Sequence, residues 1–246
     1  MNVYHITYGP ATKIVQLHFW GCNLGCRSCL LKREIYDCHL AETKDRIFRR
    51  QNESNKTPDK FLSMEEVMQW LNKLEVGEVI FMGAEPALDP QLPILAKKLH
   101  RKFSSHNVLL TNGFQLTDLN DIDEVVFSIK AYNDTIHRDY TGVSNKKALK
   151  NFVTLYKSGI KLRTESVFIP EYIDGPEIEN IARFIAGIDR SIPYRIDAYI
   201  PIGDNPWRRP TPQETENAAS LARQHLTNVS YLTGNEDLKY EVVRIY

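Results

Sequence analysis

The sequence predicts an α/β protein in which parallel strands alternate with helices. Two observations lead to this prediction. Short runs rich in Val, Ile, Leu and Phe recur along the chain, and segments with a helical spacing of apolar residues lie between them. Strands buried on both faces have this continuous apolar character, and strand–helix–strand repeats give parallel pairs with right-handed crossovers. The pattern fits an α/β barrel or an open sheet.

Six candidate strands carry the apolar pattern. They span residues 13–19, 78–82, 107–111, 124–129, 161–168 and 195–199. Each is a run of about five to eight residues, which is the usual length of a strand. A last run, 240–245, is a candidate edge strand.

Helices are expected between these strands. Residues 63–74 open on a capping box formed by Ser63 and Glu66. Segments 90–103, 145–157 and 176–188 also have helical spacing. The last helix is expected from Thr211 to about residue 226, because Thr211 and Glu214 form a second capping box and Pro212 takes the first helical position.

The chain is expected to form a single domain over residues 1–246. That length is at the upper end of what one domain holds, and the sequence contains no internal repeat and no linker. Segment 41–60 is polar and charged without a clean period. It is therefore predicted to be a surface loop or a lid inserted after the loop that carries the cysteines.

Charge and hydropathy favour neither nucleic acid nor a membrane as a partner. Thirty-one basic residues balance 31 acidic ones. No apolar run approaches the ~20 residues that a membrane span needs. The first residues lack the apolar core of a signal peptide, so the expected location is the cytoplasm.

The central signal is a cluster of cysteines directly after the first strand. Cys22, Cys26 and Cys29 have the spacing C-x3-C-x2-C, and all four cysteines lie between positions 22 and 38. Clustered cysteines in a reducing compartment indicate a metal site rather than disulfides. Three thiolates on one tight loop can each take one iron of a cubane cluster and leave the fourth iron open. Gly21 and Gly25 supply the backbone freedom for such a loop.

Two other interpretations of the cysteines remain open. A zinc site needs four ligands, and Cys38 with His39 could complete one. The cysteines could also be buried structural residues. The cluster interpretation is favoured because no second C-x2-C pair is present, and Cys38 is then expected to be free or peripheral.

The cysteine spacing resembles the signature of the radical S-adenosylmethionine superfamily. The resemblance implies a single partial (β/α)6 barrel with a [4Fe–4S] cluster on Cys22, Cys26 and Cys29. It also implies S-adenosylmethionine bound at the open iron and cleaved reductively to a 5′-deoxyadenosyl radical. One departure is Ser28, because the superfamily usually has an aromatic residue before the third cysteine.

Two further motifs resemble the same superfamily. Met82-Gly-Ala-Glu-Pro86 is similar to its Gly-Gly-Glu-Pro motif, which implies that Gly83, Ala84 and Glu85 bind the amino group of the methionine moiety. Thr111-Asn-Gly113 is similar to the end of the third strand in the activating enzymes of glycyl-radical enzymes, and implies a cofactor contact for Asn112. By themselves both motifs also fit ordinary turns.

The later strands resemble the pyruvate formate-lyase activating enzyme group. Lys130 is assigned by this resemblance to a carboxylate of substrate or S-adenosylmethionine, and Ser128 lies two residues before it. Glu165 is expected either to bind a ligand or to pair with Arg163, which lies on the same strand face. The other possibility is that Glu165 and Arg163 both point outward, under a helix. At three positions this chain differs from that group. Leu110, Ser128 and Ile200 stand where the group has acids or a histidine.

The resemblance implies an enzyme, an oxidoreductase that activates a glycyl-radical enzyme. Reduced ferredoxin or flavodoxin would supply the electron, and the partner glycyl-radical enzyme would be the protein substrate. One alternative is a radical enzyme with a small-molecule biosynthetic substrate. Others are a non-catalytic iron–sulfur electron carrier and a zinc-binding module. Carriers normally give each cluster four protein ligands, which disfavours the carrier.

Overall fold

The protein folds around one curved, mostly parallel sheet. The computed structural model describes residues 1–32, 40, 57–202, 204–236 and 239–246. Among these residues the nine strands have the order β8-β7-β6-β5-β4-β3-β2-β1-β9. Strands β2 to β8 are parallel, whereas β1 and β9 are antiparallel to their neighbours. The α/β class with parallel strands is confirmed.

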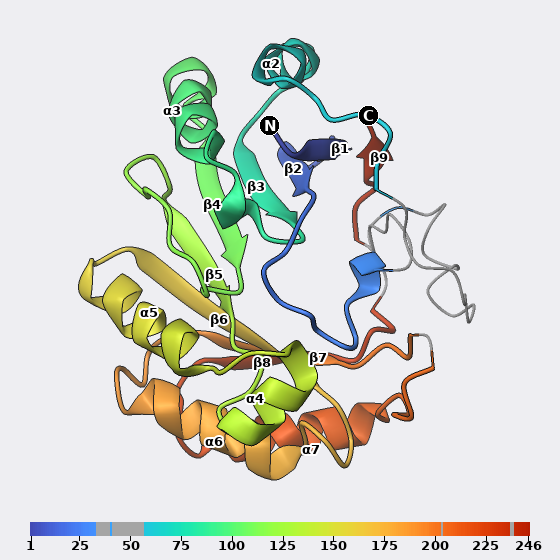
Figure 1. Ribbon diagram of the computed structural model, residues 1–246, viewed down its shortest axis with the longest axis vertical. Coiled ribbons are helices and arrows are strands. Elements are labelled where there is room, and N and C mark those ends of the chain that lie inside the picture. The colour runs from blue at the N-terminus through green and yellow to red at the C-terminus, as the bar shows by residue number, and fades with distance from the viewer. Residues whose placement is uncertain (33–39, 41–56, 203, 237–238) are drawn as a thin grey trace.

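Figure 1 shows the sheet bending from β1 and β2 round to β7 and β8 as an open, partial barrel. The helices α2, α3, α5, α6 and α7 lie outside the bend, and the segment after β2 lies inside it. The strand bounds are Val3–Gly9 for β1, Ile14–Phe19 for β2, Glu78–Gly83 for β3, His106–Thr111 for β4, Glu124–Ser128 for β5, Lys161–Phe168 for β6, Tyr194–Ala198 for β7, Val229–Leu232 for β8 and Val243–Arg244 for β9.

Two of the described helices begin at the capping boxes that the sequence predicts. Helix α2 (Met64–Leu71) and helix α7 (Pro212–Arg223) each open on the predicted capping box, at Ser63 and Thr211. The other helices are α3 (Leu92–Phe103), α4 (Asp134–Thr141), α5 (Lys146–Lys157) and α6 (Gly175–Ala186). Short 3₁₀ turns, η1 (Leu30–Lys32) and η2 (Pro86–Leu88), follow β2 and β3.

The core lies between the outer face of the sheet and these helices. Phe127 of β5 packs edge-on against Phe152 of α5, with ring centroids 5.2 Å apart. Because successive side chains of a strand point to opposite faces, Ser128 points into the bend. The sheet thus has an apolar outer face and an inner face that carries polar groups.

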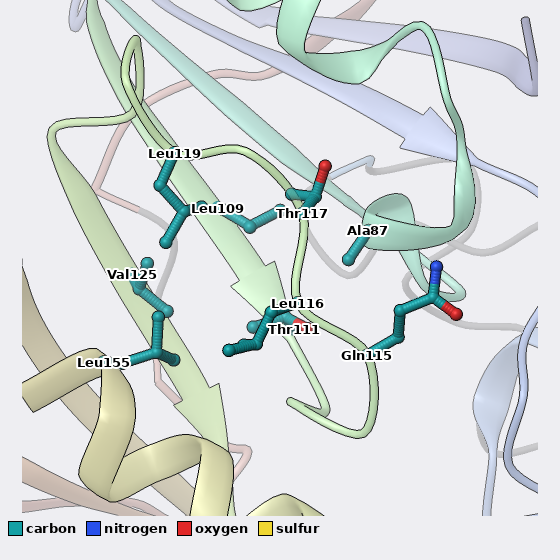
Figure 2. A pocket seen from close by; sticks show the side chains of 9 residues that line it. All are labelled: Ala87, Leu109, Thr111, Gln115, Leu116, Thr117, Leu119, Val125 and Leu155. Atoms are coloured by element: carbon teal, nitrogen blue, oxygen red, sulfur yellow. The ribbon is translucent and has the colours of Figure 1, made fainter. Parts of the chain in front are cut away.

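The connection between β4 and β5 has no helix within residues 112–123, all of which the structure describes. Its apolar side chains cover the sheet instead. Figure 2 shows a small, mostly apolar pocket at this place, where Leu116 and Leu119 of the connection face Leu109, Val125 and Leu155. The pocket lies on the helix-covered side of the sheet.

Among the described residues, three helices or strands were not predicted from the sequence. They are β1, β8 and helix α4, which occupies part of the motif between Tyr132 and Gly142. The expected edge strand at 240–245 is present as the shorter β9, paired with β1. Of the predicted loop 41–60, residues 41–56 lie outside the described residues, as do Cys38 and His39, and residues 57–60 form neither helix nor strand.

Candidate active site

The residues singled out in the sequence follow four neighbouring strands. The cysteine loop follows β2, and Gly83 ends β3 with Ala84 and Glu85 directly after it. Asn112 follows β4 and Lys130 follows β5. Since the carboxyl ends of parallel strands meet at one edge of a sheet, these residues lie together there. Ligand sites of α/β proteins are typically found at this edge.

Helix α4 holds the cysteine loop in place. The N–H of Gly25 donates to the Thr141 carbonyl at 2.7 Å, and the N–H of Arg27 donates to the Tyr140 carbonyl at 2.9 Å. Both acceptors belong to the last turn of the helix, where carbonyls have no partner within the helix. A Cβ on Gly25 would lie 3.1 Å from the Thr141 oxygen, so a glycine allows this close approach.

Arg27, between the second and third cysteines, joins three other segments. Its guanidinium pairs with Asp139 of α4 at 2.8 Å and lies 4.5 Å from the ring centroid of Trp207. Tyr172 stacks on Trp207 with centroids 4.4 Å apart, and its hydroxyl donates to Asp139 at 2.5 Å. We call Arg27, Asp139, Tyr172 and Trp207 the Arg27 cluster. Sequence reasoning missed it, because its members are far apart in the chain.

The three thiols are close enough to influence one another. Partial burial of its sulfur raises the pKa of the Cys22 thiol, although much of the residue is exposed; the Leu24 N–H opposes this rise. The negative charges of Glu85, Cys26 and Cys29 raise it further. Two N–H groups reach the Cys22 sulfur, from Leu24 at 3.4 Å and from the Asn112 amide at 3.6 Å.

The donor set fits an iron–sulfur cluster better than a single ion. Among the described residues, no three Cys, His, Asp or Glu side chains are spaced to share one metal ion. In a cubane each thiolate binds a different iron, so the sulfurs need not converge on one point. Three thiols on a single loop match that arrangement.

Glu85 is buried at the end of β3, with only 1% of its surface exposed. One oxygen accepts from the Thr111 hydroxyl at 2.7 Å and the Ala87 N–H at 3.1 Å, and the other accepts from the Asn112 N–H at 2.7 Å. Burial raises the pKa of this carboxyl, and these three donors and Lys130 offset part of the rise. The carboxylate thus ties the β3 turn to the end of β4.

A polar row crosses the inner face of β5, β6 and β7. Ser128 donates to Glu165 at 2.7 Å, and Arg195 pairs with Glu165 at 2.6 Å and with Asp197 at 2.8 Å. Ser128, Glu165 and Arg195 are direct register partners on the three strands. Of the possibilities that the sequence left open for Glu165, pairing with Arg163 is wrong, because Glu165 pairs with Arg195 and Arg163 contacts Glu124 of β5.

Lys130 lies between this row and the cysteine loop. Burial lowers the pKa of the ammonium, but the negative charges of Cys26, Tyr140, Glu165 and Cys29 outweigh burial and the pKa is raised. Lys130 therefore stays a cation, suited to a carboxylate ligand. The sequence-predicted residues do come together at one edge of the sheet, with Arg195 and Asp197 as unpredicted neighbours.

The model of the Radical SAM superfamily matches residues 17–185, which is more than half of the chain. The chain belongs to the radical SAM superfamily. A Methanocaldococcus jannaschii protein that is assigned by name to the glycyl-radical enzyme activating enzymes is 31% identical over 231 residues, covering 88% of this chain and 79% of that protein. The pyruvate formate-lyase-activating enzyme of Clostridium pasteurianum is 25% identical over 213 residues, covering 82% and 81%.

A solved structure has the same fold. A domain of the pyruvate-formate lyase-activating enzyme from Bacteroides vulgatus superimposes with a TM-score of 0.54 at 18% identity, covering 63% of this chain and 99% of that domain. Together with the family match, this similarity supports the partial barrel. Among the described residues, no helix is long and apolar enough to cross a membrane.

Proposed function

We propose that this radical SAM enzyme carries a [4Fe–4S] cluster on Cys22, Cys26 and Cys29 and activates a glycyl-radical enzyme. The observation that carries the proposal is the cysteine loop, docked on α4 at the carboxyl edge of the parallel sheet. When bound, a [4Fe–4S] cluster with an open iron passes one electron to S-adenosylmethionine, whose C–S bond breaks into methionine and a 5′-deoxyadenosyl radical. Reduced ferredoxin or flavodoxin supplies that electron.

The residues around the loop would bind and orient S-adenosylmethionine. The strand-end carbonyls of Gly83 and Ala84 are suited to its cationic amino group, and Glu85 holds the turn that presents them. Lys130 is suited to its carboxylate. Ser128 and Glu165 would line the inner face below it.

The proposed substrate is a glycine of a partner enzyme. The radical would take one hydrogen atom from the glycine Cα, leaving a glycyl radical and 5′-deoxyadenosine. The names of the relatives from M. jannaschii and C. pasteurianum support this choice. Leu110, Ser128 and Ile200 stand where the activating enzymes have acids or a histidine, so a small-molecule substrate is the alternative to be tested.

The cluster chemistry is tested by anaerobic reconstitution with iron and sulfide, followed by dithionite and S-adenosylmethionine. We expect 5′-deoxyadenosine by chromatography from the wild-type protein. The Cys26→Ala protein should form at least ~100-fold less, because one iron loses its thiolate. Cys38→Ala is the matched control and should keep its iron content and its activity. A protein that binds zinc and no iron would contradict the proposal.

The substrate is tested separately, with a glycyl-radical enzyme encoded beside this protein. Electron paramagnetic resonance should show a glycyl radical in the partner only when cluster, reductant and S-adenosylmethionine are all present. If 5′-deoxyadenosine forms but every such partner remains without a radical, the cluster chemistry stands and the proposed substrate is wrong.

A further inference from the structure

The side chain of Asn112 connects the end of β4 to the cysteine loop. Its amide nitrogen donates to the Asn23 side-chain oxygen at 2.9 Å and to the Cys22 sulfur at 3.6 Å. Only 7% of the residue is exposed. This is a direct side-chain contact to one of the three thiols from outside their own loop.

The orientation of the amide is fixed from two sides. Its oxygen accepts the N–H of Phe114 at 2.9 Å, so the nitrogen must face the cysteine loop. Its backbone N–H donates to the buried carboxylate of Glu85 at 2.7 Å. A side-chain amide has two N–H donors, so the one nitrogen can serve both Asn23 and Cys22.

We infer that Asn112 is a positioning residue that raises the reduction potential of the cluster through its N–H contact with Cys22. This inference rests on the proposed function, in which Cys22 is a cluster ligand. Reduction adds negative charge to the cluster, and a hydrogen bond to a ligand sulfur stabilises that charge. Glu85 supports the contact by holding the Asn112 backbone. This buried acid therefore has a role even if it does not itself touch S-adenosylmethionine.

The test is the midpoint potential of the reconstituted cluster, titrated under anaerobic conditions and followed by electron paramagnetic resonance. Asn112→Leu removes the donor. Asn112→Asp keeps the size and the acceptor for Phe114 but replaces the donor with a negative charge. For both variants we expect a more negative potential. At a fixed potential the ratio of reduced to oxidised cluster should fall about threefold or more in Asn112→Leu, and further in Asn112→Asp.

Asn151→Leu is the matched control. The Asn151 amide donates to the Gly113 carbonyl at 2.8 Å, so it braces the same turn without reaching the cysteines. Its midpoint potential should equal that of the wild type. An equal shift in Asn151→Leu would show that the position of the turn, and not the N–H contact, sets the potential, which overturns the inference.

The outcomes separate this inference from the proposed function. If the wild-type protein forms no [4Fe–4S] cluster, the proposed function fails. If the cluster forms and both Asn112 variants keep the wild-type potential, only the inference is wrong. Should Asn112→Leu fail to fold, Asn112→Ala, which also removes the donor and adds no charge, is compared with the wild type instead.

Discussion

At the scale of single residues, Gly83 is the most constrained position of the site. Its φ is +108°, in the region that residues with a Cβ rarely adopt. An added Cβ would lie 2.6 Å from the Phe19 carbonyl oxygen and 2.7 Å from the Phe19 nitrogen. Both contacts are with the backbone of the neighbouring strand β2, which cannot move aside without disturbing the sheet. The adjacent Ala84 does not have a positive φ, so an alanine can occupy that place in the motif.

We therefore expect Gly83→Ala to destabilise the protein by about 3 kcal/mol or more, from strain and the clash together. Urea unfolding of the apo-protein measures the loss. Gly187→Ala is the matched control: Gly187 ends α6 with a φ of −65°, so the change should be neutral or slightly stabilising. Equal stability of the two variants would show that the close approach of β2 and β3 does not exclude a side chain at position 83.

At the scale of elements, helix α4 connects the cysteine loop to the rest of the site. Its last carbonyls receive the loop, and Asp139 brings Arg27 against Tyr172 and Trp207. The cation also lies at the carboxyl end of the helix, where a positive charge is favourable. The loop conformation thus depends on segments that follow β5, β6 and β7.

Removing the guanidinium should loosen the loop. For Arg27→Ala we expect a loss of about 1 to 2 kcal/mol in stability, from the ion pair and the contact with the Trp207 ring, and less iron retained after reconstitution. Arg138→Ala is the control on the same helix, since its exposed pair with Asp134 should contribute at most about 0.5 kcal/mol. Urea unfolding and iron content measure both effects. If Arg27→Ala retained as much iron as the wild type, the cysteine loop would hold its shape without the Arg27 cluster.

The elements differ in how far the sequence predicts them. Strand β6 was predicted at both ends, and the capping boxes at Ser63 and Thr211 begin their helices as expected, because these signals are local. Helix α4 was missed because it is short and polar, with His137 and Tyr140 as buried members rather than an apolar stripe. Strand β8 has only four residues, too few to establish a period.

The candidate site shows the same difference between local features, which the sequence predicts, and long-range contacts, which it does not. The cysteine spacing is read from eight consecutive residues, whereas the pairing of Glu165 with Arg195 depends on the register of β6 against β7. Register is set by the packing of whole strands and helices, so the sequence alone could offer only the nearer Arg163 as a pairing partner, among other possibilities for Glu165. The Asn112 contact to Cys22 joins positions 90 residues apart in the chain and has no local signal.

At the scale of the whole molecule, a charged network lies at the amino ends of β4, β5 and β6, opposite the candidate site. His100 contacts Asp121 at 3.2 Å and Asp123 at 2.7 Å. His106 lies 3.8 Å from Asp123 and 3.5 Å from Glu124. Lys161 and Arg163 also pair with Glu124. This network links α3 to three strands, so its protonation contributes to the stability of the sheet.

The protonation of His100 gives that stability a pH dependence. Burial lowers the pKa of His100, but Asp123 and Asp121 outweigh burial, so the pKa in the folded protein is raised. The stabilisation is therefore complete below the unfolded pKa of about 6.5 and is lost as the pH rises through the folded pKa. The pKa of Asp123 is lowered, because its bonds with the Asn107 N–H and His100 outweigh burial, so its contribution is lost at acid pH instead.

Between about pH 6 and pH 8.5 we expect the wild-type protein to lose more stability than His100→Gln does. The difference should be at most about 1 kcal/mol, because His100 and its aspartate partners are partly exposed. Urea unfolding of the two apo-proteins at both pH values measures this difference, and the subtraction removes the contributions of the other histidines. As the pH falls below about 4, the unfolded pKa of an aspartate, the contribution of Asp123 is lost progressively and both proteins should weaken. Parallel losses of wild type and variant across the alkaline interval would show that His100 carries no charge in the folded protein. The network would then hold α3 to the sheet through neutral hydrogen bonds.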